Sequence, residues 1–189
     1  IIFKTDRVGD FLHLTGCIRT IRENFIDAHI TLVCSRQNYQ LAKNYLIINT
    51  FIVIDRFGFI KTLITNFKSF FNTYYDYLFV LDGKKRSFIL SCFVKSKNRN
   101  TICFVKKKRI LGINYLVSRP SKLILKIFFN NYVLSDENYS NTEIVYQNLY
   151  FKLLSQINLE IKSKKNLFIH DPKYKKNFNS FYNKFIKKE

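Results

Sequence analysis

Short apolar runs recur along the first 105 residues of the chain. They are residues 1–5 (IIFKT), 30–34 (ITLVC), 51–54 (FIVI), 77–81 (YLFVL) and 101–105 (TICFV). Each run is continuously apolar instead of alternating between apolar and polar residues. This pattern is typical of strands that are covered on both faces of a parallel sheet. We therefore expect a buried strand at each run.

The segments between these runs carry the spacing of amphipathic helices. Apolar residues recur every three or four positions at Phe11, Leu14, Ile18, Ile21 and Phe25, and again at Ile60, Leu63, Ile64, Phe67, Phe70 and Phe71. Each set makes one apolar stripe on a helix. Strands that alternate with helices indicate right-handed βαβ units. The predicted fold is α/β, a Rossmann-like parallel sheet with flanking helices over residues 1 to about 110.

The pattern loosens after residue 105. Residues 106–122 (KKKRILGINYLVSRPSK) predict a surface connection, because Gly112 and Pro120 break regular structure. A helix capped by Asn141 or Thr142 is expected at about 141–156, with an apolar face of Ile144, Tyr146, Leu149, Leu153 and Leu154. A last lysine-rich helix is expected after Pro172, with a stripe of Tyr174, Phe178, Tyr182 and Phe185.

The charge balance favours anionic partners. The 189 residues include 32 Lys and Arg against 13 Asp and Glu, which gives a net charge of +19. Part of this excess follows from a composition rich in Lys, Asn, Ile and Phe, so the charge alone is weak evidence for binding. No apolar run approaches the roughly 18 residues that a membrane-spanning helix needs, and a cytoplasmic protein is expected.

The cysteines and the absence of methionine add two expectations. Cys17, Cys34, Cys92 and Cys103 lie far apart without a CxxC pair, which disfavours a zinc site or a disulfide framework. We expect them to be small buried residues in a reducing compartment. Because the chain contains no methionine, we also expect that it begins part-way into its first strand.

Basic residues gather where the predicted strands end. In an open parallel sheet, ligands bind outside the carboxyl ends of the strands. The residues there include Arg7, Arg36, Arg56, Lys84, Lys85, Arg86 and Lys106 to Lys108, beside Asp6, Asp55 and Asp82. An anionic ligand would explain this cluster, and helix N-termini would add N–H donors to it. The loops of any lysine-rich protein would collect the same residues, and the two interpretations carry about equal weight.

Asp10 has two interpretations. As an acid in the first turn of a helix it gains about 0.3–1 kcal/mol from the helix dipole. As a general base it would lie at the cleft, where Gly9 lets the backbone approach a ligand. His13 lies three residues further on, off the apolar stripe, where it could bind an anion, hold Asp10 in place or simply be a partly exposed histidine. The absence of G-x-G-x-x-G and P-loop patterns disfavours dinucleotide and Walker-type nucleotide binding.

Two segments resemble a known family. Residues 3–38 (FKTDRVGDFLHLTGCIRTIRENFIDAHITLVCSRQN) are similar to the start of the heptosyltransferases, glycosyltransferase family 9, with their K/R-x-D-R-x-G-D turn and D-A-x-I-T element. Residues 75–99 (YDYLFVLDGKKRSFILSCFVKSKNR) resemble the family's D-L-V-I-D-L-Q-G-x-x-R-S stretch, with Gly83, Arg86 and Ser87 in register. The helix near 141–156 departs from the family, because Thr142 stands where the family usually has His.

The resemblance implies a GT-B glycosyltransferase built from two Rossmann-like domains. Residues 1–170 would be its N-terminal acceptor-binding domain, and the basic helix at 171–189 would lead to a missing C-terminal donor-binding domain. Asp10 corresponds to the family's proposed catalytic base, which deprotonates the acceptor hydroxyl as the nucleoside diphosphate is displaced with inversion. The acceptor-binding residues would be Arg7, Gly9, His13, Lys84, Lys85 and Arg86.

The same resemblance implies substrates and a location. The donor would be a nucleotide-sugar such as ADP-heptose, and the acceptor the acidic inner core of lipopolysaccharide, with no cofactor, no metal and no nucleic acid. The enzyme would be bacterial and cytoplasmic, and its basic helix at 173–188 could rest on the inner membrane. As half of an enzyme, the chain alone would be inactive. Two rivals are a non-catalytic basic binding protein for nucleic acid or anionic lipid, and a degenerate transferase that only scaffolds an assembly.

Overall fold

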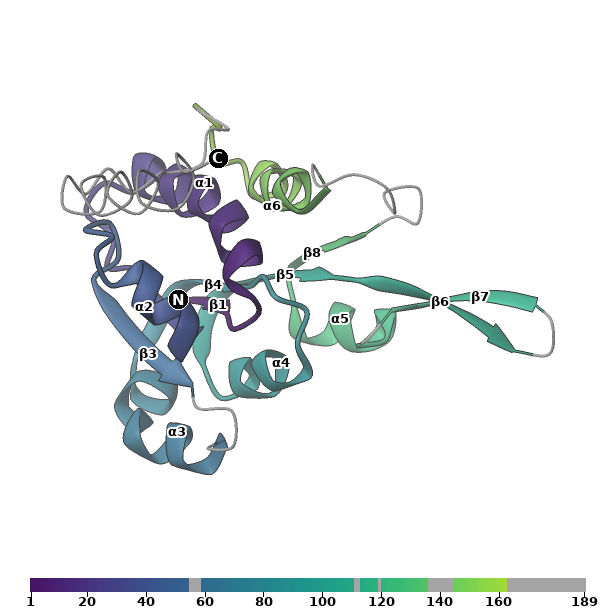
Figure 1. Cartoon of the computed structure of the whole chain (residues 1–189), viewed down its shortest axis with the longest axis horizontal. Coiled ribbons are helices and arrows are strands. Elements are labelled where there is room, and N and C mark those ends of the chain that lie inside the picture. Colours follow the sequence, from purple (N-terminus) through teal and green to yellow (C-terminus); the bar gives the residue numbers. More distant parts are fainter. Residues whose placement is uncertain (55–58, 111–112, 119, 136–144, 163–189) are drawn as a thin grey trace, which may run out of the picture.

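The fold is an open six-stranded parallel sheet with helices on both faces (Figure 1). The computed structural model describes residues 1–54, 59–110, 113–118, 120–135 and 145–162, with 59, 106–110, 113–118, 145 and 146 described by their backbone alone. The strand order is β3-β2-β1-β4-β5-β8, and every neighbouring pair is parallel. The strands are β1 (Ile2–Lys4), β2 (Thr31–Ser35), β3 (Thr50–Ile54), β4 (Tyr74–Val80), β5 (Lys95–Cys103) and β8 (Asn131–Leu134). The predicted Rossmann-like sheet is confirmed, and β8 extends it beyond residue 110.

The helices form two layers, and each layer packs on the sheet through its own apolar core. One core joins the sheet to α1 (Val8–Asn24), α2 (Arg36–Ala42) and α6 (Val145–Gln156). The other joins it to α3 (Phe59–Thr65), the π-helical turn η1 (Lys68–Asn72), α4 (Lys85–Cys92) and α5 (Lys122–Phe128). In Figure 1 the helices α3, α4 and α5 lie below the sheet, while α1 and α6 lie above it. No helix in the described ranges is long and apolar enough to cross a membrane.

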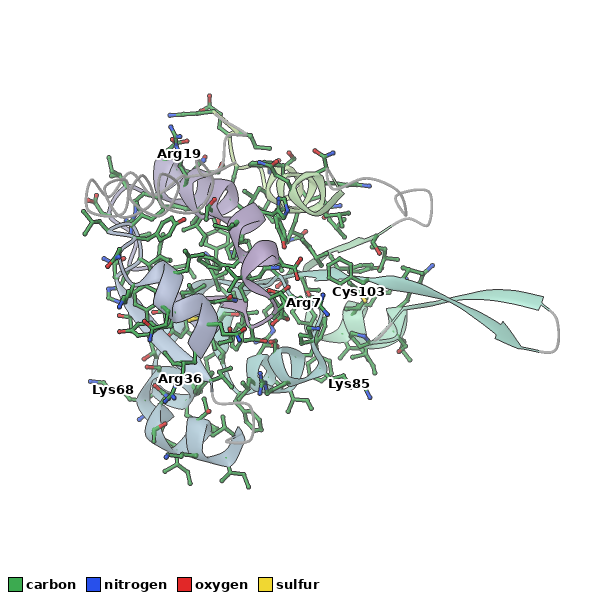
Figure 2. The ribbon with its side chains drawn as sticks, in the orientation of Figure 1. Arg7, Arg19, Arg36, Lys68, Lys85 and Cys103 are labelled. Atoms are coloured by element: carbon green, nitrogen blue, oxygen red, sulfur yellow. The ribbon has the colours of Figure 1, made fainter. Side chains whose placement is uncertain are left out.

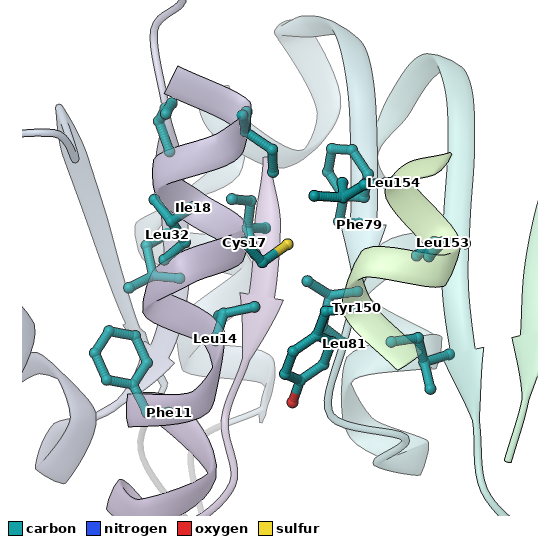
Figure 3. Close-up of a cluster of buried hydrophobic side chains, with 14 of the residues drawn as sticks. Phe11, Leu14, Cys17, Ile18, Leu32, Phe79, Leu81, Tyr150, Leu153 and Leu154 are labelled. Atoms are coloured by element: carbon teal, nitrogen blue, oxygen red, sulfur yellow. The ribbon is translucent and has the colours of Figure 1, made fainter. Parts of the chain in front are cut away.

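The first predicted helix is confirmed and carries much of one core. Phe11, Leu14, Ile18 and Ile21 are buried on α1, and Phe25 at its end is half-buried. Figure 3 shows this stripe beside Leu32 of β2, Phe79 of β4 and Leu81, which follows β4, with α6 next to them. Each fully buried side chain of this size stabilises the fold by about 1.5–3 kcal/mol. The stripe therefore holds α1 against the sheet.

The second predicted stripe is only partly confirmed. Phe70 is buried and Leu63 half-buried, but Ile60, Ile64 and Phe67 are 71%, 69% and 54% exposed. The reason is that the segment forms two short pieces, α3 and η1, which turn Leu63 and Phe70 toward the sheet. The three exposed residues follow the spacing i, i+4, i+7 and so lie on one side of the segment.

The predicted surface connection at 106–122 is wrong. Strands β6 (Val105–Ile110) and β7 (Ile113–Ser118) form an antiparallel hairpin that projects away from the sheet in Figure 1. Ile110 pairs with Ile113, so two residues connect the two strands. After Pro120, the Ser121 hydroxyl accepts a hydrogen bond from the Ile124 backbone N–H and starts α5. Gly112 and Pro120, which were expected to break regular structure, therefore lie between β6, β7 and α5 in the sequence.

Of the remaining predictions, some are confirmed, one is wrong, and others concern residues outside the described ranges. In α6, Leu149, Leu153 and Leu154 are buried as expected. The predicted cap at Asn141 or Thr142, the last helix at 171–188, and Asp55 with Arg56 lie outside the described residues. Cys17, Cys34 and Cys103 are buried as expected, and burial raises the thiol pKa of Cys17 and Cys34 to about 12. Cys92, at the end of α4, is exposed, contrary to the prediction, because it lies on the side of α4 that faces away from the sheet.

Candidate functional site

The sheet has one point where its connections diverge. From β1 the chain moves outward through β2 and β3, whereas from β4 it moves the other way through β5 and β8. The loops after β1 and β4 therefore lead to helices on opposite faces. In open α/β sheets ligands bind at such a point, outside the carboxyl ends of the two neighbouring strands, and we call this edge the crevice. All seven site residues predicted from the sequence belong to the segments that follow β1 and β4. Figure 2 shows Arg7 at the start of α1 and Lys85 at the start of α4.

A buried lysine anchors the β1 side of the crevice. Lys4, the last residue of β1, is 0% exposed, and its ammonium donates to the Asp6 carboxylate at 2.7 Å and to the Leu81 carbonyl at 3.2 Å. It also donates to the Tyr150 hydroxyl of α6 at 2.6 Å, and it lies 5.2 Å from the centre of that ring. All three ammonium protons thus have a partner. Removing one partner of such a buried ion pair costs about 3–5 kcal/mol.

Asp6 completes this ion pair in a buried position. Its side chain is 7% exposed, and burial raises its pKa to about 6. Lys4 opposes this shift, while the negative charges of Asp82 and Asp10 add to it. Oδ1 of Asp6 is buried and has no hydrogen-bond partner among the described residues. The Asn38 side-chain amide of α2 donates to the backbone carbonyls of Lys4 and Asp6, both at 3.1 Å, and holds the turn in place.

Asp82 ties the two walls of the crevice together. Its Oδ2 accepts hydrogen bonds from the Thr5 backbone N–H at 2.9 Å, the Thr5 hydroxyl at 2.6 Å and the Ser87 hydroxyl at 2.5 Å. Its Oδ1 accepts from the Lys84 backbone N–H at 3.0 Å. With four donors and 3% exposure, this carboxylate is a structural clamp between the loops after β1 and β4. Its burial and these four hydrogen bonds leave it little exposed to a ligand.

Gly83 is required by the same turn. Its φ is +59°, a left-handed conformation that side chains with a Cβ rarely adopt. A Cβ at this position would lie 2.5 Å from Cδ2 of Phe104. Gly83, which contributed to the family resemblance, thus has a structural explanation of its own.

Asp10 differs from the other two carboxylates. It lies in the first turn of α1 and is half-buried. The N-cap of α1 is Arg7, and no side-chain hydrogen bond caps this end of the helix. Within the described ranges, the Asp10 carboxylate makes no hydrogen bond or ion pair. Of the three carboxylates that the structure describes after β1 and β4, Asp10 is therefore the one available to a ligand.

The neighbours of Asp10 leave room for a ligand. Arg7 and Gly9 are exposed, and His13 is half-buried on α1. A Cβ built on Gly9 would have no heavy atom within 4 Å, so this turn of the helix faces open space. A ligand could approach the backbone closely at this position.

The basic cluster is smaller than the sequence suggested. Arg7, Lys84 and Lys85 are exposed and Arg86 is half-buried at the crevice, and Arg36 is exposed at the start of α2 after β2. Lys106 to Lys108 lie on β6 of the projecting hairpin, so the prediction that they end a sheet strand at this edge is wrong. Within the described part of the chain, no group of three or more His, Cys, Asp or Glu side chains could hold a metal ion.

The matches to known proteins came from the comparison of structures. Neither a scan of protein-family models nor a search of curated proteins found a match to the sequence. Among solved structures, a glycosyl transferase of family 9 from Veillonella parvula superposes with a TM-score of 0.68 at 17% identity, over 97% of this chain and 48% of that one. E. coli ADP-heptose lps heptosyltransferase II gives a TM-score of 0.58 at 15% identity, over 95% of this chain and 49% of that one.

A third structure agrees with these two. E. coli heptosyltransferase WaaC with ADP gives a TM-score of 0.55 at 13% identity, over 88% of this chain and 48% of that one. The chain thus spans about half the length of the solved structures that it matches. At these identities the likeness establishes the fold, and it agrees with the resemblance in the sequence. The chain has the fold of about half of a family 9 glycosyltransferase structure.

Proposed function

We propose that this chain is the acceptor-binding half of a glycosyltransferase, with Asp10 as its catalytic base. One observation carries the proposal. At the crevice where ligands bind in this fold, Asp82 is used by four hydrogen bonds and Asp6 by the Lys4 ion pair, while Asp10 is partly exposed and unengaged. Lys4 also neutralises the charge of Asp6, which reduces the repulsion that a second nearby carboxylate would exert on Asp10.

The proposed reaction needs one proton acceptor on this chain. An acceptor hydroxyl gives its proton to the Asp10 carboxylate, and its oxygen forms a bond to the anomeric carbon of the donor sugar. The bond from that carbon to the diphosphate oxygen breaks on the opposite side, and the nucleoside diphosphate leaves with the electron pair. The configuration at the anomeric carbon is therefore inverted. No cofactor or metal is part of this proposal beyond the nucleotide-sugar itself.

The donor and acceptor are proposed from different observations. Two of the matched structures contain ADP and ADP-2-deoxy-2-fluoro heptose, which supports a nucleotide-sugar such as ADP-heptose as donor. The acceptor would be an acidic glycolipid of the lipopolysaccharide-core type, attracted by Arg7, Lys84, Lys85 and Arg86. Open space above Gly9 admits the sugar, and His13 lies one turn further along the same helix.

The fold and the coverage of the matched structures support the proposed domain arrangement. Residues 1–170 would form the acceptor domain, and the segment 171–189 would lead to a donor-binding domain of a longer protein. The chain alone would then bind acceptor without transferring sugar to it. A cytoplasmic enzyme at the inner face of a bacterial inner membrane suits a lipid acceptor of this kind.

The test is the substitution Asp10→Asn in the full-length protein, with sugar transfer and urea unfolding measured side by side. Loss of a general base lowers the rate by about 10²- to 10⁴-fold, and acceptor binding and stability should stay close to wild type. Asp27→Asn is the matched control, because Asp27 is exposed at the opposite, amino edge of the sheet. An unchanged transfer rate for Asp10→Asn would sink the base assignment.

The rival of a basic binding protein is tested on the same material. It predicts that arbitrary polyanions bind with a steep dependence on salt, and that Asp10→Asn binds them more tightly. The glycosyltransferase proposal predicts selective binding of the acidic glycolipid, weakened by Lys84→Gln or Lys85→Gln but not by Lys97→Gln at the amino edge. Equal effects of these three lysine substitutions would favour the rival.

A further inference from the structure

Apolar side chains are exposed on the outer side of one helix layer. Nine of the fourteen large exposed apolar residues in the described ranges lie on α3, α4 or α5, or cap η1 or α4. They are Ile60 (71%), Ile64 (69%), Phe67 (54%), Ile89 (51%), Phe93 (37%), Leu123 (69%), Ile124 (44%), Ile127 (68%) and Phe128 (42%). We call this surface the α3–α5 face. The side of α5 that faces away from the sheet thus exposes more apolar residues than the water-facing side of a helix usually does.

The charges on the α3–α5 face have one sign. The segments 59–72, 84–95 and 121–130 contain eight basic residues and no Asp or Glu. Seven of the eight are exposed lysines: Lys61, Lys68, Lys84, Lys85, Lys95, Lys122 and Lys126. The opposite layer differs, because α1 carries Asp10 and Glu23 among its arginines and pairs Arg19 with Glu23 at 2.7 Å. In these segments the layer that exposes apolar side chains therefore carries charges of one sign, whereas α1 of the opposite layer carries both signs.

Ring contacts join the helices of this layer into one surface. Phe67 stacks on Phe71 at 4.7 Å between ring centres, and Phe71 contacts Phe93 at 5.5 Å, which links η1 to the end of α4. Phe88 and Phe129 meet edge-to-face at 5.6 Å and link α4 to α5. In Figure 1 the three helices lie in a row below the sheet.

Arg99 of β5 braces the same surface from beneath. Its guanidinium donates to the carbonyls of Ser91 and Val94 at the end of α4, at 2.6 and 2.7 Å. It also donates to the carbonyl of Phe128 at the end of α5, at 2.8 Å. Two helix C-termini are thus held by one side chain, and the outward residues of α4 and α5 keep a fixed relation to each other.

We propose that the α3–α5 face docks on the surface of an anionic lipid bilayer. Exposed apolar side chains insert at the headgroup boundary, and lysines among them are attracted to negatively charged lipids. The long lysine stems cover apolar surface while their ammonium groups stay at the headgroups. Binding to a protein partner would not require that the segments of this face contain no Asp or Glu. Lys84 and Lys85 belong both to this face and to the crevice, so a docked chain would hold its crevice beside the lipid surface.

This inference extends the proposed membrane contact and assigns it to a described surface. It is tested on vesicles without acceptor or donor, so its failure would leave the glycosyl-transfer proposal untouched. The full chain is sedimented with vesicles of phosphatidylcholine containing phosphatidylglycerol, and with vesicles of phosphatidylcholine alone. We expect binding to the anionic vesicles that weakens with salt and is at least tenfold weaker to the neutral ones.

Matched variants test the face itself. Leu123→Gln with Ile127→Gln, and Ile60→Gln with Ile64→Gln, should each lower the partition coefficient at least tenfold. The control is Ile26→Gln with Leu46→Gln, because these residues are 78% and 97% exposed outside the α3–α5 face. Equal losses in control and test variants, or unchanged binding in both test variants, would overturn the proposal.

Cys92 offers a second readout that does not depend on mutating the face. It is exposed at the end of α4, whereas the other three cysteines are buried, so a thiol-reactive fluorophore labels it selectively. Emission of a polarity-sensitive label at Cys92 should shift to the blue on anionic vesicles. The same label on Cys92→Ser with Leu46→Cys should not shift. No shift at Cys92, or concentration-dependent dimers that bury the label without lipid, would overturn the membrane assignment.

Discussion

The buried Asp6 carboxylate should make the chain less stable as pH rises from about 4 to about 6. Its folded-state pKa is about 6 against an ordinary value of 3.8, so the folded chain binds this proton more tightly than the unfolded chain does. The stabilisation from this group is thus fully present below the lower value and is lost as pH passes the higher one. At about 1.36 kcal/mol per pKa unit, the loss is about 3 kcal/mol. The side chain is 7% exposed, so solvent screens little of it.

The assay compares wild type with Asp6→Asn. Urea unfolding of both proteins at several pH values between 4 and 7 gives two stability curves, and their difference removes the contribution of all other titrating groups. The stability of wild type minus that of the variant should fall by about 3 kcal/mol across this range. Asp27→Asn, an exposed carboxylate, should show no such fall. A difference that is constant or rises with pH would refute the raised pKa and the burial that explains it.

Three further substitutions test single features. Gly9→Ala should leave the free energy of unfolding in urea unchanged or raise it by about 0.5–1 kcal/mol. It should also raise the KM for acceptor, because the added methyl enters open space that we assign to the ligand. An unaltered KM contradicts that assignment. Gly83→Ala should cost about 1–3 kcal/mol in the same assay, because φ is +59° and Phe104 must move; a neutral result contradicts the strained turn. Arg99→Met should lower the free energy of unfolding by about 2–4 kcal/mol, since three carbonyls lose their donor. Arg99→Lys should recover less than half of this loss. Full recovery by lysine would contradict the role of Arg99 in joining α4 to α5.

The sheet was predictable from the sequence because its strands are buried on both faces. Continuous apolar runs marked β1 to β5, and the stripe from Phe11 to Ile21 marked α1. The hairpin was missed because β6 is rich in lysine and stands off the sheet, so its residues never had to be apolar. The short strand β8 was missed because only three of its four residues, Tyr132, Val133 and Leu134, are apolar, which is a shorter run than those that predicted strands.

The site was predictable only where it is local in the sequence. Asp10 and Arg7 follow a strand directly, and their position alone placed them at the crevice. Tyr150 was missed because it lies 146 residues from Lys4, and no local pattern pairs a strand lysine with a distant helix tyrosine. Asp82 was expected only as one of several polar groups at the edge, because a sequence does not show how many donors surround a carboxylate. A lysine inside the apolar run at residues 1–5 was the one signal that a buried partner exists.

The hydrogen bonds to Asp82 have a consequence for recognition. By joining Thr5 to Ser87 through one carboxylate, they make the two walls of the crevice a single rigid body. A ligand between Asp10 and Lys84 then meets groups whose spacing is set before it arrives, and little chain entropy is lost on binding. Selectivity would arise from the fit of the ligand to a fixed frame, and any closing motion would have to come from outside this sheet.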